Sequence, residues 1–284
     1  MISDYRCFFC FAKAYEKLLV EEKLSNSDCL SFTREMSELY AKQTANFSAP
    51  VFSRALHKAL YKYTLNADPH KEGKKQSNDL VLSMYDELRC KVLASVNPFN
   101  TALRLAIAGN IIDFAMGRNY DLPATIEKVQ TCGFAIDHSK KLQEALSKAK
   151  TVLYLGDNNG EIVFDKLFLE TINHPNLYFA VRGAPVINDV TMYDAIYVGI
   201  DKVVKNVISN GYDAPSTLIE HCSEEFKDLF NQADVIISKG QGNLEGLLGK
   251  TSKEVYFLLM VKCDVIADAL YVKKGDFVVK KNNF

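Results

Sequence analysis

The segment GDNNG at residues 156–160 places one carboxylate and two side-chain amides between two glycines. It follows the apolar run 152–155, which is typical of a buried strand, and precedes residues 161–171, which are typical of a helix. The polar residues would then lie at the carboxyl end of a strand and the amino end of a helix. In open α/β sheets, this is where ligands bind.

Two further polar segments repeat this arrangement. RGAPVIND at residues 182–189 follows the apolar run 177–181, and SKGQGN at residues 238–243 follows the run 235–237. Parallel strands place their carboxyl ends at one edge of a sheet, and we therefore expect the three polar segments to lie together.

The combined side chains suit a phosphate group bound together with a metal ion. The oxygens of Asp157, Asp189 and the neighbouring amides are hard ligands, which Mg²⁺, Mn²⁺ and similar divalent ions prefer. Arg182 and Lys239 supply positive charge for phosphate oxygens, and glycine turns at helix starts offer backbone N–H groups to an anion. The sequence therefore predicts a metal-assisted phosphate site.

Each of these residues also has a simpler explanation. Asp157 and Asp189, taken singly, are better explained as turn or helix-cap residues. Lys239 alone is better explained as a solvated lysine, and residues 238–243 alone are a weak match to a glycine loop. The hypothesis of a site depends on the agreement of the three segments.

The elements that must position this edge fall into two halves. Residues 1–150 are predicted to be almost entirely helical, whereas short apolar runs alternate with helical segments in residues 151–284. This alternation predicts parallel strands joined by crossover helices. We expect an α/β fold, a three-layer α/β/α Rossmann-like unit with a mostly parallel sheet, preceded by an N-terminal all-helical subdomain. The predicted strands are 152–155, 177–181, 203–208, 235–237 and 255–261.

A predicted helix at residues 98–117 carries a polar pair, Asn110 and Asp113, on one face among apolar residues. The pair could tie two helices together, or it could face the cleft and bind substrate hydroxyls. A helical half of about 150 residues is a large addition to a unit that could stand alone, since domains typically have about 100–150 residues. We therefore expect the helical half to cover the cleft and to select the leaving group.

Composition narrows the class of protein. The 284 residues are 48% hydrophobic and 24% charged, as in an ordinary globular protein, and the formal net charge is −1. A general nucleic-acid binder needs a large basic surplus, so we expect no nucleic-acid partner. The sequence has no apolar stretch of the roughly 20 residues that a membrane span needs, and no membrane association is expected. Seven cysteines without a regular framework favour a reducing cytoplasm.

Cys7 and Cys10 form a single C-x₂-C pair near the start of the chain. A structural zinc site usually takes four ligands, often from a second such pair, which the sequence lacks. Burial as small apolar side chains is therefore the favoured interpretation of the two cysteines.

Three classes of function compete for the predicted cleft: a metal-dependent phosphohydrolase, a methyl-donor or dinucleotide enzyme, and a non-catalytic protein that binds phosphorylated metabolites. A dinucleotide site expects G-x-G spacing and an acid after the second strand, whereas the chain has Gly156, Gly160 and Arg182. A haloacid-dehalogenase-like phosphatase expects an acid two positions after its nucleophilic Asp, where this chain has Asn159. The phosphohydrolase is favoured.

Six motifs occur in order along the chain: Cys7-x-x-Cys10, DPHKE at 68–72, GNIIDF at 109–114, GDNNGEIVFD at 156–165, RGAPVINDVT at 182–191 and SKGQGNLEG at 238–246. Together they give the whole chain a resemblance to the damage-control phosphatases, a metal-dependent family formerly known only as a domain of unknown function. The chain looks similar to the mainly prokaryotic branch that carries an early C-x₂-C. Some relatives have been described as carboxyl methyltransferases, which keeps an S-adenosylmethionine-dependent carboxyl methyltransferase as an alternative.

The resemblance implies one divalent ion, Mg²⁺, Mn²⁺, Co²⁺ or Ni²⁺, held by Asp157, Asn158 and Asp189. It also implies that Lys239 lies near the phosphate of a small phosphorylated metabolite, such as a sugar phosphate or a damaged cofactor precursor. Either a metal-bound water or Asp157 would attack the phosphorus.

Further residues are predicted to contact the substrate. The backbone N–H groups from Gly240 to Asn243 would hold the phosphoryl group and offset charge in the transition state. The other expected cleft residues are Arg182, Asn188, Asn110 and Asp113.

Overall fold

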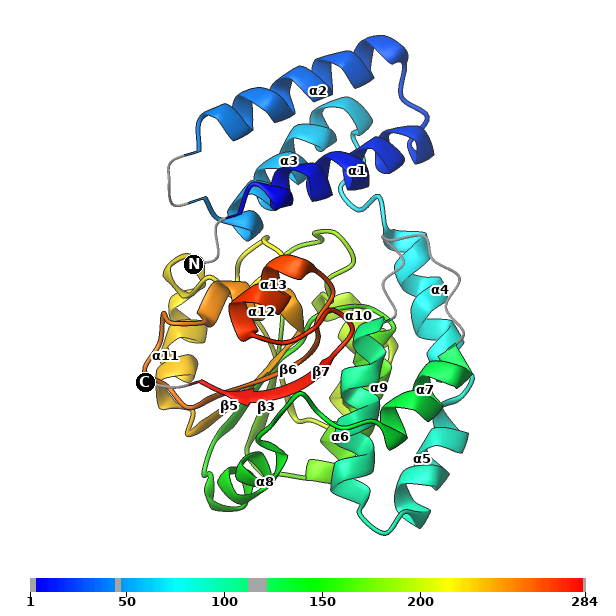
Figure 1. Cartoon of the computed structure of the whole chain (residues 1–284), viewed down its shortest axis with the longest axis vertical. Helices are drawn as coiled ribbons and strands as arrows, with labels where there is room; N and C mark the ends of the chain where they lie inside the picture. The colour runs from blue at the N-terminus through cyan, green and yellow to red at the C-terminus, as the bar shows by residue number, and fades with distance from the viewer. Residues whose placement is uncertain (1–3, 44–46, 112–121, 283–284) are drawn as a thin grey trace.

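The computed structural model describes residues 4–43, 47–111 and 122–282. Within these residues, seven strands form one sheet in the order β1-β7-β6-β5-β2-β3-β4 (Figure 1). β6 and β7 pair antiparallel, and the other neighbouring strands pair parallel. The sheet is therefore mostly parallel, as predicted. The strands are β1 (Ile136–Asp137), β2 (Val152–Leu155), β3 (Leu177–Val181), β4 (Asn206–Ser209), β5 (Val235–Lys239), β6 (Val255–Met260) and β7 (Phe277–Lys281).

The central strands are uniformly apolar because helices cover both faces of the sheet. In β2, Val152 and Tyr154 belong to one buried cluster, and Leu153 and Leu155 belong to the cluster on the opposite face. This alternation is the period of two that a strand imposes. The α/β/α layering predicted from the alternating runs is confirmed.

Helices from both halves of the chain make the two covering layers. α6 packs along α9, and α4 and α5 also contact α9, on one face, while α11 to α13 lie on the other (Figure 1). The helices are α4 (Lys71–Leu82), α5 (Tyr85–Ala94), α6 (Pro98–Ala108), α7 (Leu122–Thr131), α8 (Ser139–Lys148), α9 (Glu161–Ile172), α10 (Met192–Tyr197), α11 (Glu224–Gln232), α12 (Gly240–Leu247) and α13 (Asp264–Leu270), with 3₁₀ turns at Gly109–Ile111, Ile200–Lys202 and Ile219–His221.

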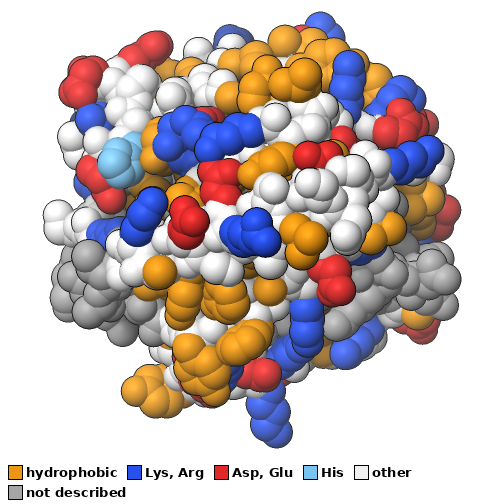
Figure 2. All heavy atoms as spheres, turned by 90° about the horizontal axis from the view of Figure 1, so that it is seen from above, with side chains coloured by type: hydrophobic (Ala, Val, Ile, Leu, Met, Phe, Trp, Pro, Cys, Tyr) orange, Lys and Arg blue, Asp and Glu red, His pale blue; other side chains and the backbone are white. Residues whose placement is uncertain are grey.

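α1 (Arg6–Glu21), α2 (Asn26–Ala41) and α3 (Ala49–Thr64) form a bundle with its own buried cluster. The bundle lies above the sheet unit in Figure 1, and α3 packs on α12. Seen from the side of this bundle, basic and acidic side chains are interspersed, with apolar side chains between them (Figure 2). The helices after α3 instead share a core with the sheet, and the predicted division at residue 150 stays a prediction.

Several predicted boundaries differ from the structure. The strand predicted at 203–208 is β4 at 206–209, because residues 200–202 form a 3₁₀ turn and the chain reaches the sheet later. The short β1 and the terminal β7 were not predicted. The helix predicted at 98–117 ends at Ala108 and continues as the turn Gly109–Ile111, and Asp113 lies outside the described residues.

No helix in the described residues is both long and apolar enough to cross a membrane. The same residues contain Cys7 half-buried and Cys10 exposed. The interpretation of Cys10 as a buried side chain is therefore wrong, since the outer surface of α1 carries this position.

The close crossing of α6 and α9 gives a first prediction. A Cβ on Gly109 would lie 2.8 Å from a ring carbon of Phe164 and 3.2 Å from the Cα of Glu161. Gly109→Ala should lower the free energy of unfolding by about 1–3 kcal/mol, because overpacking forces the helices apart. Gly73→Ala in α4, where nothing lies within 4 Å, should gain up to about 1 kcal/mol. Urea unfolding measures both, and equal effects of the two variants would contradict the close packing.

Candidate metal and phosphate site

The loops that follow β2 and β3 are joined by backbone hydrogen bonds. The N–H of Asn159 donates to the carbonyl of Asn188 over 3.0 Å, and the N–H of Val190 donates to the carbonyl of Asp157 over 2.8 Å. Asn158 and Asp189 face each other as an isolated bridge. The structure thus brings the predicted metal ligands Asp157, Asn158 and Asp189 together, all three of them buried.

The loop after β5 packs against the same carboxylate. Gly240 has φ +75°, and a Cβ there would lie 1.8 Å from the Asp157 Oδ2. The Asn243 Nδ2 donates to the carbonyls of Gly156 (3.1 Å) and Lys239 (2.8 Å), and this fixes the start of α12 beside the Asp157 loop. Glycine at position 240 therefore meets two demands, a left-handed conformation and a close approach to Asp157.

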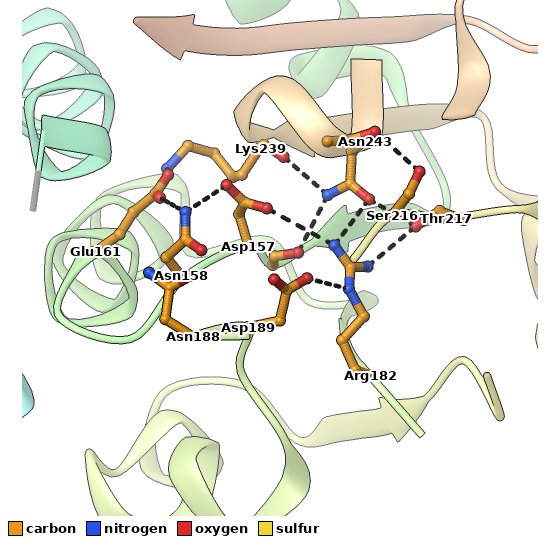
Figure 3. A network of polar contacts seen from close by, with 12 residues as sticks. Asp157, Asn158, Glu161, Arg182, Asn188, Asp189, Ser216, Thr217, Lys239 and Asn243 are labelled. Carbon is orange, nitrogen blue, oxygen red and sulfur yellow. Dashed lines mark hydrogen bonds and ion pairs between the residues drawn. The ribbon is translucent and has the colours of Figure 1, made fainter. Parts of the chain in front are cut away.

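Arg182 is 2% exposed and its guanidinium contacts both acidic residues (Figure 3). Its Nε donates to the Asp189 Oδ2 over 2.6 Å, and one terminal nitrogen lies 3.7 Å from the Asp157 Oδ1. The terminal nitrogens also donate to Thr217 and Asn243. The guanidinium is thus engaged with the carboxylates that it orients, and its predicted contact with substrate stays a prediction.

Lys239 is also enclosed, with no exposed surface. Its Nζ donates to the Glu161 Oε1 (2.6 Å), to the Ala106 carbonyl (2.9 Å) and to the Asp165 Oδ1. Burial lowers the pKa of Lys239, but the carboxylates of Asp165 and Glu161 outweigh this effect and the net shift is upward. The ammonium has three acceptors for its three N–H bonds.

Side-chain amides complete the network. The Asn110 Nδ2 donates to the Glu161 Oε2 (2.8 Å) and to the Asp157 Oδ2 (3.3 Å), and the Asn158 Nδ2 donates to the same two oxygens. Asn110 is fully buried, so the structure places it against the predicted metal ligands. Its predicted partner in substrate binding, Asp113, lies outside the described residues.

The amide of Asn159 connects the site to α4. Its Oδ1 accepts from the Asn78 Nδ2 over 2.7 Å, and its Nδ2 donates to the carbonyls of Asn188 and Asp189. The Asn78 Oδ1 in turn accepts from the N–H of Gly160 over 2.7 Å. Asn188, predicted to contact substrate, takes part in these contacts through its backbone carbonyl.

The carboxylates dominate the electrostatics of the site. The pKa of Asp157 is raised well above its ordinary value by burial and by the nearby Glu161 and Asp189, while Lys262 and Arg182 oppose the shift. Burial also raises the pKa of Asp165, to about 7. Four carboxylates (Asp157, Glu161, Asp165 and Asp189) thus face the two buried cations Arg182 and Lys239. When all six are ionised, the carboxylates outnumber the two buried cations by two, and Lys262 adds a further positive charge near Asp157.

Sequence reasoning missed Glu161, Asn78 and Lys262. Glu161 was visible as the first residue of the helix that follows Asp157, where an acidic residue is ordinarily a response to the helix dipole. Nothing in the local sequence connects Asn78 to a loop 81 residues away. Lys262 follows β6, at the same edge of the sheet as the three predicted loops.

The chain matches the family model described as "Damage-control phosphatase ARMT1-like domain" over residues 3–278. The chain belongs to the damage-control phosphatase family. This membership confirms the resemblance predicted from the six motifs and supports a phosphatase role.

Relatives cover almost the entire chain. A protein named damage-control phosphatase PH1575, from Pyrococcus horikoshii, is 35% identical over 289 residues, which cover 99% of this chain and 98% of that protein. A damage-control phosphatase from Archaeoglobus fulgidus is 30% identical over 93% of this chain and 92% of its own length. The crystal structure of a DUF89 family protein (ph1575) from P. horikoshii has a TM-score of 0.88 and 31% identity, and the match covers 100% of both chains.

Gly240 gives a prediction that separates a steric clash from backbone strain. Gly240→Ala should displace the carboxylate of Asp157 and abolish phosphatase activity. Gly249→Ala is a matched control, because Gly249 has φ +71° and a Cβ there would have nothing within 4 Å. Both variants should lose about 1–2 kcal/mol of stability to the left-handed backbone, but only Gly240→Ala should also lose activity. Steady-state phosphate release and urea unfolding measure the two effects, and an active Gly240→Ala variant would contradict the close approach of Gly240 to Asp157.

Glu245 gives a prediction about pH. Its pKa is raised to about 7 by burial, while a hydrogen bond from Gln241 opposes the shift. Between pH 4.5 and 7 the folded protein keeps a proton that the unfolded chain releases, so stability falls as pH rises through this range. Glu245→Gln cannot ionise and should lose less stability than the wild type between pH 5 and pH 8, by up to about 3 kcal/mol. Urea unfolding of metal-free protein measures this difference.

Proposed function

We propose that the protein is a metal-dependent phosphatase of small phosphate esters, with one divalent ion held by Asp157, Asn158 and Asp189. The observation that carries this proposal is the buried convergence of these side chains, in a group where four carboxylates face two buried cations. Family membership supports the phosphatase activity. Metal dependence and the class of ester are the inferred parts.

The donor set fits a hard divalent ion. Two carboxylates and one amide oxygen are ligands that Mg²⁺ and Mn²⁺ accept, and Co²⁺ and Ni²⁺ also bind such sites. The proposed set joins two carboxylates to the amide of Asn158; among the described residues, no three His, Cys, Asp or Glu side chains form a metal-binding group by themselves. An ion bound there would supply positive charge to the phosphoryl oxygens.

Recognition of the phosphate involves other groups of the chain. The first N–H groups of α12, at Gly240 to Gly242, have no partner within the helix and favour an anion. Lys262, whose charge lowers the pKa of Asp157, adds a cation close to the same carboxylate. The N–H groups and Lys262 would offset charge on the transferring phosphoryl group. Attack on phosphorus comes either from a water or from a carboxylate oxygen of Asp157.

The contacts of the α1–α3 bundle support the proposal that the bundle selects the leaving group. α3 packs on α12, and Arg54 of α3 forms an ion pair with Asp213, in the segment that follows β4. Arg6 of α1 pairs with Asp268 of α13. The bundle therefore contacts elements that follow three strand ends, where the part of a small phosphorylated metabolite beyond its phosphate would lie.

A cytoplasmic location stays a prediction from the cysteines.

The central test compares isosteric variants of the predicted ligands. Asp157→Asn and Asp189→Asn should each lower kcat by at least about 100-fold, because each removes one charged ligand or a nucleophile. Asp86→Asn, at an exposed position of α5, should keep wild-type activity. Phosphate release from sugar and cofactor phosphates is measured after chelation and after addition of Mg²⁺, Mn²⁺, Co²⁺ or Ni²⁺.

Full activity of either ligand variant, or metal-independent turnover, would refute the proposal. Binding of S-adenosylmethionine without phosphate release would favour the methyltransferase alternative. Tight binding of phosphate esters without turnover under any metal would favour a non-catalytic protein.

A further inference from the structure

Lys239 is held on the side of β5 that faces α6 and α9. It shares this side with Val235 and Ile237, whose side chains belong to the core between the sheet and these helices. Its Nζ contacts Glu161 and Asp165 of α9 and the carbonyl of Ala106, near the end of α6. A cation is favourable beside the last carbonyls of a helix. The three contacts account for all three of its N–H bonds.

Asp165 is fixed from a second direction. Its Oδ1 accepts from the hydroxyl of Tyr154 over 2.7 Å as well as from Lys239. Tyr154 lies on β2, three residues before Asp157, and its ring stacks on Phe179 with centroids 5.5 Å apart. The position of Lys239 is therefore set by two carboxylates, one helix end and a tyrosine that is itself packed in the core.

Glu161 transmits this arrangement to the site. One oxygen, Oε1, accepts from Lys239, and the other, Oε2, accepts from the amides of Asn110 and Asn158. The amide of Asn158 has its nitrogen directed to Glu161 and Asp157 (Figure 3). The side-chain carbonyl oxygen of Asn158 is therefore the atom that could bind a metal ion.

We propose that Lys239, supported by Asp165 and Tyr154, is a positioning residue that acts through Glu161 to fix the amide of Asn158 for metal binding. This inference rests on the proposed metal-dependent function and specifies what the buried lysine does there. Partners of metal ligands typically change metal affinity by about 10- to 100-fold when they are removed. A lysine in this role affects metal binding before any substrate is present.

The competing hypothesis is that Lys239 contacts the substrate phosphate directly, and it predicts different results. Such a contact requires the Nζ to leave at least one of its three acceptors and to reach the opposite side of Glu161. In that case Lys239→Met would impair turnover but leave metal affinity unchanged, and the loss would persist whatever residue occupied position 161.

The test is a double-mutant cycle read out by Mn²⁺ binding to the metal-free full-length protein, measured by calorimetry without any ester. Lys239→Met and Glu161→Gln should each raise the Kd for Mn²⁺ by about 10- to 100-fold. In the Glu161→Gln background, Lys239→Met should change the Kd by less than about twofold, which is the usual error of additivity for independent sites. The double variant removes both partners of the Lys239–Glu161 pair, while Asp165 keeps the hydroxyl of Tyr154 as a donor.

Two tyrosine variants test the same proposal with a smaller change to the network. Tyr154→Phe keeps every charge and removes one hydrogen bond to Asp165, and it should weaken Mn²⁺ binding by a smaller factor. Tyr256→Phe is the matched control, because Tyr256 is also a buried tyrosine of the sheet but donates at the opposite end, near Lys141 and Glu254. If Lys239→Met does not fold, the tyrosine pair decides the question.

Unchanged Mn²⁺ affinity in Lys239→Met, a further loss in the double variant, or equal affinities of the two tyrosine variants would overturn the proposal. A wild-type protein that binds no Mn²⁺ would overturn it as well. A wild-type protein that binds Mn²⁺ but releases no phosphate would refute the proposed function alone, since the cycle is measured without substrate.

Discussion

The constraint on which the structure depends is the burial of four carboxylates at the strand ends. An isolated buried carboxylate costs several kcal/mol, because the protein interior solvates charge poorly. Asp157 and Asp165 show this cost directly as raised pKa values. The four carboxylates face only two buried cations, with Lys262 as a further cation near Asp157. The burial of these carboxylates is therefore unfavourable by itself, and hydrogen bonds and ion pairs from several elements hold the side chains in place.

The fold meets this constraint with contacts from elements far apart in the chain. Two helices of the first half, α4 and α6, pack against α9 and bring Asn78 and Asn110 to the loop after β2. The two amides donate and accept at defined atoms, so they orient the loop without adding charge. The first half of the chain is thus part of the candidate site itself. A core shared by helices of both halves is the physical reason why Asn110 cannot reach solvent.

The sequence predicted the parts of this arrangement that follow from periodicity. Apolar runs located β2 and β3 to the residue, and the topology of parallel strands explains why three loops meet at one edge. Strand periodicity also indicates which way the side chain of Lys239 points. In a strand, residues two apart share a face, and Ile237 belongs to the face covered by α6 and α9, so Lys239 had to point into that core. Contacts such as Asn78 with Asn159 had no such signal, because no local pattern states which loop a helix will meet.

Both buried cations, Arg182 and Lys239, are engaged with carboxylates. Under the proposed function, the start of α12 and Lys262 would meet charge on a substrate, and the α1–α3 bundle packs on α12 through α3. The bundle is joined there by ion pairs such as Arg6 with Asp268, whose side chains are 38% and 67% exposed. Exposed ion pairs contribute only about 0–1 kcal/mol each. The exposed pair therefore adds little to the attachment of the bundle, whereas the buried network depends on close packing and charge.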